Sequence, residues 1–148
     1  MKSIRSLIDM PVVCCGKKTG RVAQVCLSED LQRLDGLWID AGLSGTRFVP
    51  AEHICRLGDA AVLTDVPGRR MRCGQQPLFL RAVSEDGLRL GAVSGAEIDE
   101  LSFRVEALEL SHGYLDDLLA GRTRVRSFTV SPQGGSVIID LSGEDPGT

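Results

Sequence analysis

Long apolar runs are missing from this sequence: no stretch reaches the roughly 18 residues that a membrane-spanning helix needs. Residues 1–7 also lack the apolar core of a secretory signal. The five cysteines are odd in number and have no framework spacing, so reduced thiols are expected rather than disulfides. These absences predict a cytoplasmic protein that has no membrane partner.

Aromatic residues are scarce, at 4% of the chain, with one Trp, one Tyr and four Phe. Nucleic-acid surfaces usually combine a net basic face with stacking aromatics. Residues 75–148 carry 6 Lys and Arg against 12 Asp and Glu, whereas residues 1–74 carry 11 against 8. RNA or ribosome binding is therefore an alternative function and not the main prediction. The uneven charge suits contacts between the two halves or with a symmetric partner.

No CxxC motif is present, so the candidates for a metal or redox site are Cys14, Cys15 and Cys26, together with the pair His53 and Cys55. Neighbouring residues of a strand point to opposite faces, so Cys14 and Cys15 are not expected to share one tetrahedral ion. Buried thiols acting as small apolar groups are the expected alternative. No cofactor is predicted, and a metal- or redox-responsive protein remains a second alternative function.

Catalytic signatures are also absent. Neither His53 nor His112 has a neighbouring Ser or Cys in a motif that activates a nucleophile. The carboxylates of Asp116 and Asp117 would splay apart by roughly 100° on a helix, which does not suit an acid and base pair. The protein is therefore predicted not to be an enzyme.

What the sequence does contain is a series of short strands bounded by turn residues. A single helical turn is expected at residues 51–54 and a short helix at residues 115–119, which Gly121 would end. The expected strands are residues 11–15, 22–27, 34–40, 46–50, 55–57 and 60–64, then 78–83, 88–98, 103–110, 122–130 and 136–141.

The strand pattern repeats after about half the chain. The first half would cover residues 1–74 and the second, more diverged half residues 75–141, with a disordered tail at 142–148. Two small β-barrels in tandem are expected, because closure removes strand edges that small sheets cannot protect. Sharp bends at barrel corners are expected at four strand glycines: Gly20, Gly36, Gly91 and Gly95.

The first half resembles a PRC-barrel domain. The resemblance rests on structural glycines and apolar positions in the segments Gly20-Arg21-Val22-Ala23-Gln24-Val25, Gly36-Leu37-Trp38-Ile39, Phe48-Val49-Pro50, Ile54 and Gly58-Asp59-Ala60-Ala61-Val62. The second half looks like a diverged copy, and its segment from Ser111 to Arg122 is similar to one in tandem PRC-barrel proteins of bacteria.

The resemblance implies a six-stranded barrel that works as a docking or assembly module. The family includes the cytoplasmic domain of the photosynthetic reaction-centre H subunit, the C-terminal domain of a ribosome-maturation factor, and stand-alone bacterial proteins, some of them linked to sporulation. Another protein or a second copy of the chain is the partner that this implies, with a homodimer expected.

Candidate partner-binding residues lie mainly in the second half. In a strand, residues 122, 124 and 126 share one face and would present a stripe of guanidinium groups for carboxylates or phosphates. The predicted partner-binding residues are Arg122, Arg124, Arg126, Tyr114, Asp116 and Asp117. A basic contact in the linker is predicted at Arg69, Arg70 and Arg72.

Overall fold

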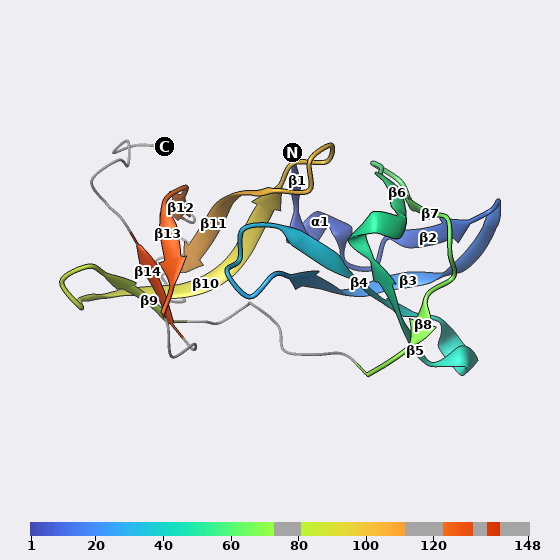
Figure 1. The fold of residues 1–148 in the computed structure, drawn as a ribbon, viewed down its shortest axis with the longest axis horizontal. Coiled ribbons are helices and arrows are strands. Elements are labelled where there is room, and N and C mark those ends of the chain that lie inside the picture. The colour runs from blue at the N-terminus through green and yellow to red at the C-terminus, as the bar shows by residue number, and fades with distance from the viewer. Residues whose placement is uncertain (73–80, 112–122, 132–135, 140–148) are drawn as a thin grey trace.

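A computed structural model describes residues 1–72, 81–111, 123–131 and 136–139 of the chain. Strands account for 61% of it and helices for 9%, which confirms the predicted β class. The strands form two curled half-barrel sheets that lie one after the other along the long axis of the molecule (Figure 1). In the part that is described, no helix is long and apolar enough to cross a membrane.

The first sheet contains seven strands from the first half of the chain, in the order β6-β7-β2-β3-β4-β5-β8. All neighbours are antiparallel except β2 and β7, which run parallel. Two 3₁₀ turns, η1 (Gly42–Ser44) and η2 (Ala51–His53), flank β5. The strands are β2 (Pro11–Cys14), β3 (Lys17–Leu27), β4 (Leu34–Asp40), β5 (Thr46–Pro50), β6 (Ile54–Leu57), β7 (Val62–Thr64) and β8 (Arg69–Arg70).

The second sheet has the order β12-β11-β10-β9-β14-β13, with β9 and β14 parallel. Its strands are β9 (Arg81–Ser84), β10 (Arg89–Ile98), β11 (Val105–Ser111), β12 (Thr123–Val125), β13 (Phe128–Val130) and β14 (Ser136–Ile139). The strand β1 (Lys2–Ser3), from the start of the chain, adds to β10.

The two sheets are copies of one topology. The path from β6 to β5 in the first sheet matches the path from β13 to β12 in the second, strand for strand. The irregularities in pairing also recur 71 positions later: the shift between Cys26 and Leu27 in β3 returns between Glu97 and Ile98 in β10. Extra residues that interrupt a ladder bend a strand, so the curl of both sheets has the same origin.

The inner faces of the two sheets are correspondingly alike. In the first sheet the inward side chains of β3 and β4 include Val22, Leu37 and Ile39, all fully buried. The positions 71 residues later hold Val93, Leu108 and Leu110, which are also buried. One apolar cluster includes residues of both sheets, so the two halves share a core instead of two thin separate ones.

The loops that follow β3 and β10 meet between the sheets. Arg33 and Arg104 form an isolated antiparallel bridge. On one side Leu34 N donates to Phe103 O at 2.8 Å, and on the other Val105 N donates to Gln32 O at 2.8 Å. Because these residues are equivalents 71 positions apart, the contact is reciprocal, as at a two-fold axis.

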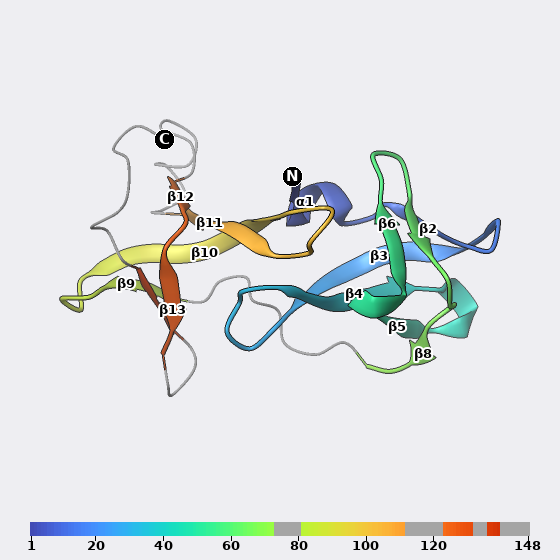
Figure 2. The same cartoon turned by 45° about the horizontal axis from the view of Figure 1, so that its top comes forward.

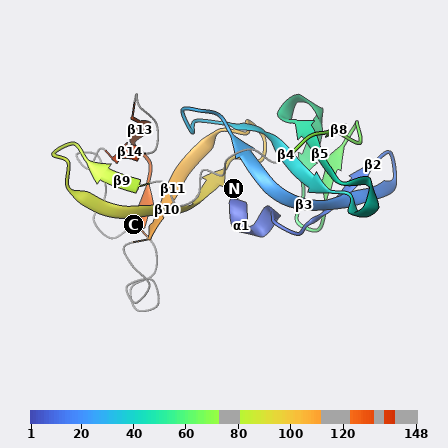
Figure 3. The ribbon, with the colours of Figure 1, turned by 90° about the horizontal axis from the view of Figure 1, so that it is seen from below.

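The helix α1 (Ile4–Leu7) lies at the same junction (Figures 2 and 3). Ser3 caps it by accepting a hydrogen bond from Ser6 N at 3.2 Å, and both Ile4 and Leu7 are buried. The sequence pattern does not indicate this helix, because one apolar turn carries little periodic signal. Together with β1, α1 ties the start of the chain to the second sheet.

The expected single strand at residues 122–130 is wrong. It is two strands, β12 and β13, which pair with different neighbours, β11 and β14. The chain therefore leaves one ladder at Arg126 and enters another at Phe128, a change that alternating side chains do not reveal. The expected boundary at residue 75, the helix at 115–119 and the tail at 142–148 lie outside the described residues.

Candidate docking pocket

The outer face of the first sheet carries the two aromatic rings of β4 and β5. Trp38 and Phe48 are directly paired across the ladder, and their ring centroids lie 5.0 Å apart at an interplanar angle of 47°. Gly36 makes room for Phe48, because a Cβ at that position would lie 2.5 Å from Phe48 Cζ. The missing side chain of a strand glycine thus seats an aromatic ring.

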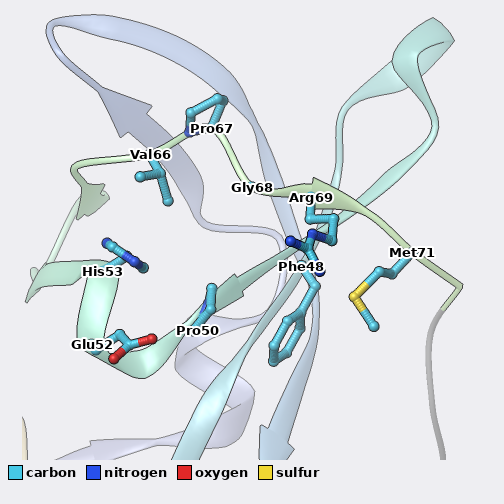
Figure 4. A pocket seen from close by; sticks show the side chains of 9 residues that line it. All are labelled: Phe48, Pro50, Glu52, His53, Val66, Pro67, Gly68, Arg69 and Met71. Atoms are coloured by element: carbon cyan, nitrogen blue, oxygen red, sulfur yellow. The ribbon is translucent and has the colours of Figure 1, made fainter.

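Beside Phe48 the surface is hollowed into a pocket of about 580 Å³ (Figure 4). One wall is the end of β5 with η2, and the other is the chain that runs from β7 to β8 and beyond it. Its lining is mainly apolar: Phe48, Pro50, Val66, Pro67, Gly68 and Met71, with Glu52, His53 and Arg69 at the rim. This volume lies within the range of ligand-binding clefts.

Backbone contacts fix the second wall. Thr64 Oγ1 donates to Val66 O at 2.8 Å, and the Arg47 guanidinium donates to Gly68 O at 3.2 Å. Gly68 has a φ of 96°, and a Cβ there would lie 3.0 Å from both Phe48 O and Val49 Cγ2. Only glycine combines that conformation with so close a crossing, so this residue holds the wall against β5.

The rim carries Glu52, which is exposed, in addition to His53 and Arg69. His53 Nδ1 lies 2.9 Å from Asp65 Oδ1, so that pair satisfies itself. By contrast Arg69, Arg70 and Arg72 are exposed, and within the described part of the chain their side chains form no hydrogen bond or ion pair. Arg69 therefore brings to the pocket a guanidinium group that has no carboxylate partner among the described residues, and Arg70 and Arg72 follow it along the chain.

The corresponding face of the second sheet has different chemistry. By register, Glu109 and Arg124 pair across β11 and β12 where Trp38 and Phe48 pair in the first sheet. Arg124 forms an ion pair with Glu97. Burial raises the pKa of the Glu109 carboxyl, as does the nearby charge of Glu97, while Arg5 and Arg124 act in the opposite direction.

Of the six partner-binding residues predicted in the second half, the structure describes two. Arg124 is engaged with Glu97 inside the sheet, and Arg126 is exposed one position beyond the end of β12, with an interaction of its own. The other four, Arg122, Tyr114, Asp116 and Asp117, lie outside the described residues. Arg124 and Arg126 therefore do not belong to one regular strand.

Of the predicted linker arginines, the structure brings Arg69 to the pocket, whereas the Arg70 guanidinium lies close to Gly45. The sequence marked Phe48 only as part of a structural motif and gave Val66 and Met71 no role. Two signals could have pointed to the site: a rare aromatic, Phe48, and an Arg-rich run that follows Pro67 and Gly68.

The thiols depart from expectation at one place. Cys14 and Cys15 were expected to point to opposite faces, but their Sγ atoms lie 3.8 Å apart. Cys15 is not in the strand; it has a φ of 53° and begins the turn to β3, so strand alternation does not apply. Cys26 and Cys55 are free thiols, and among the described residues no group of three or more His, Cys, Asp and Glu side chains is placed to hold a metal ion.

A second hollow, of about 740 Å³, opens between η2 and the loop before β11. Its lip includes Leu101, which is 91% exposed. Three of the charges at its border have partners: Arg33 lies 3.5 Å from Asp35, and Glu100 lies 2.7 Å from the Met1 amine. The pocket beside Phe48 is the better candidate, because its lining is mainly apolar and Arg69 at its rim has no ion-pair partner among the described residues.

Comparison with known proteins adds no assignment. The chain matches no model of a protein family, and a search of curated proteins found no significant match.

Proposed function

We propose that this protein is a non-enzymatic interaction module in which two PRC-barrel repeats form one cytoplasmic body. The resemblance of residues 20–62 to the PRC-barrel pattern supports the family, as does the strand order that both sheets repeat. Each repeat adds its closing hairpin parallel to its first strand, β7 on β2 and β14 on β9. Such a compact scaffold suits docking, with loops and strand edges free to contact a partner.

The observation that supports a docking role is the pocket beside Phe48, which Arg69 lines, with Arg70 and Arg72 in the same segment. None of these three arginines has a carboxylate partner among the described residues. Like charges that lie together repel one another, and an acidic partner relieves this repulsion while steering association. The partner we propose is an extended, acidic segment of another protein. One of its apolar side chains would occupy the pocket, and its carboxylates would contact Arg69, Arg70 and Arg72.

The edge of the sheet offers such a segment its backbone contacts. β8 is the last strand of the sheet and pairs with β5 along one side. Extended peptides commonly add to an exposed sheet edge, gaining affinity from main-chain hydrogen bonds and specificity from side-chain pockets. The segment from Val66 to Met71 contains the edge strand β8 and forms one wall of the pocket.

RNA fits the same surface less well. Single-stranded nucleic acid binds by stacking bases on exposed aromatic faces. Trp38 is only 6% exposed, and Phe48 is half-buried over Gly36, so neither ring is a free platform. RNA binding is therefore an outcome that the experiment must be able to detect.

The test begins with selection of binders from a random peptide library on the whole protein. We expect enrichment of sequences that combine Asp or Glu with one large apolar residue. A selected peptide is then labelled, and its affinity is measured by fluorescence anisotropy for the wild type and for Arg69→Gln/Arg70→Gln/Arg72→Gln. Exposed ion pairs contribute about 0.2–1 kcal/mol each, so the triple variant should bind about 3-fold to 100-fold more weakly.

A matched control replaces three exposed arginines elsewhere, as Arg56→Gln/Arg81→Gln/Arg89→Gln, with an equal change in net charge. This control should bind like the wild type. Three results would overturn the proposal. The two triple variants could weaken binding equally, the selection could fail to enrich acidic peptides, or a single-stranded RNA could bind the same arginines more tightly. Sedimentation analysis separately tests the expected homodimer.

A further inference from the structure

The paired thiols at the end of β2 are unrelated to the docking pocket and have an unusual setting. Cys14 is the last residue of β2 and pairs with Lys17, so Cys15 and Gly16 form a two-residue hairpin loop. Both loop residues have positive φ, 53° and 82°. That is the type I′ pattern, which favours Asn, Asp or Gly at the first position.

The turn therefore does not by itself account for a cysteine at position 15. A non-glycine side chain in the left-handed region costs free energy, and such departures, where they occur, often accompany functional sites. The side chain of Cys15 is exposed, so it gains nothing from packing in a core. Cys14, in contrast, is 9% exposed and fits the usual pattern of a buried thiol.

The geometry of the pair suits a bridging atom better than a direct bond. Adjacent Cα atoms lie about 3.8 Å apart across a trans peptide, below the roughly 4.4–6.8 Å of ordinary disulfides. A disulfide between these residues would therefore be strained and easily reduced. Two metal–sulfur bonds of about 2.3 Å that span the 3.8 Å between the Sγ atoms meet at about 110°, close to the tetrahedral angle.

We propose that Cys14 and Cys15 form a two-thiolate chelate for a thiophilic, tetrahedral metal ion of the zinc type. Each thiol loses its proton to solvent as its sulfur binds the metal, so the two thiolates balance the charge of a divalent ion. Water or a ligand supplied from outside the chain fills the two remaining positions. Open positions of this kind distinguish exchangeable metal sites from closed structural ones.

The position in the fold permits such a site. Cys14 lies beside Thr64 of the parallel strand β7, and Cys15 lies at the tip of the hairpin. A metal on the solvent side of this tip would need no change in either ladder. In the second sheet the position equivalent to Cys14 is Ser84, the last residue of β9. The pair of thiols therefore occurs in the first repeat and not at this place in the second.

The experiment is a titration of the reduced, full-length protein with Zn²⁺ against a chromophoric chelator, repeated with Cd²⁺ to observe the thiolate-to-metal absorption band. We expect one ion per chain. Cys14→Ser and Cys15→Ser should each weaken binding by at least about tenfold, since even changes outside the ligands cost 10- to 100-fold. The triple variant Cys26→Ser/Cys55→Ser/Cys73→Ser keeps only this pair and should bind like the wild type.

A conservative turn variant separates the metal site from the fold. Cys15→Asn suits the type I′ turn, so it should abolish the absorption band while keeping the circular dichroism spectrum and a melting temperature at least equal to that of the wild type. The proposal fails if the reduced wild type binds neither ion saturably. It also fails if the band survives in Cys15→Asn or disappears in the triple variant.

Discussion

The seat of Phe48 over Gly36 gives a sharp test of how the first sheet builds its outer face. In Gly36→Ala the new Cβ would lie 2.5 Å from Phe48 Cζ, 2.7 Å from Phe48 Cε2 and 2.5 Å from Val49 O. Two of these contacts involve one ring and the third is main chain in β5. The ring must therefore leave its place beside Trp38, and β5 must shift as well.

The cost follows from three terms. Overpacking of a tight site costs about 1–3 kcal/mol, and loss of the aromatic pair costs about 0.5–1.5 kcal/mol. Replacing glycine restricts the unfolded chain, which returns about 0.4–1 kcal/mol. We expect a net loss of about 0.5–4 kcal/mol, or about 1–16 °C in melting temperature at this chain length.

Denaturation by guanidinium chloride, followed by circular dichroism, measures this loss. Fluorescence of Trp38 reports separately on its pair with Phe48, because the chain has no other Trp. The decisive control is a double-mutant cycle with Phe48→Ala. Without the ring, the two contacts with Phe48 are removed and the contact with Val49 O stays, so Gly36→Ala should cost at least about 0.5 kcal/mol less than in the wild type. An equal cost in both backgrounds would refute the proposed role of Gly36.

Three further predictions concern other parts of the fold. Glu109→Gln should stabilise the protein more at pH 7 than at pH 4. The pKa of the Glu109 carboxyl is raised in the folded state, so its ionisation destabilises the wild type as the pH rises through that pKa. Denaturation midpoints at both pH values test the sign. Arg124→Met should cost about 1–3 kcal/mol by leaving part-buried Glu97 without its partner, and Glu97→Gln added to it should recover part of the loss in the same assay. Gly68→Ala should weaken binding of the acidic peptide. Gly68 has a φ of 96° and lies close to Phe48 O, so an added Cβ would move the wall of the pocket. Unchanged anisotropy would contradict this.

Much of the fold could be predicted because its signals are local. Pro50 ends β5 where the sequence placed the end, since proline cannot continue a ladder in a central position. The hairpin of β6 and β7 follows from its Gly58-Asp59 turn, in which Gly58 N donates to Ala61 O at 3.0 Å. The bend at Gly91 was also predicted: its φ is 136° and it adjoins a shift in register.

The junction and the pocket could not be predicted, because both depend on residues that no local pattern connects. Leu34 and Phe103 meet through backbone groups, which carry no side-chain signal in the sequence. The place of Arg69 beside the pocket depends on the crossing of Gly68 over β5, which alternation alone does not define. The same limit explains Cys15, whose side-chain direction is set by a left-handed turn rather than by strand periodicity.

The reciprocal junction gives a physical reason for the difference between the two outer faces. Two identical repeats around a two-fold axis would present every surface site twice. Once both repeats lie in one chain, either copy can change while the shared inner face, with pairs such as Leu37 and Leu108, keeps the core. The second repeat has an internal ion pair of Arg124 with Glu97 where the first has aromatic rings, so that arginine already has its carboxylate. A partner that replaced this contact would first have to break it. Arg69, which lies next to Phe48, has no ion pair to break among the described residues.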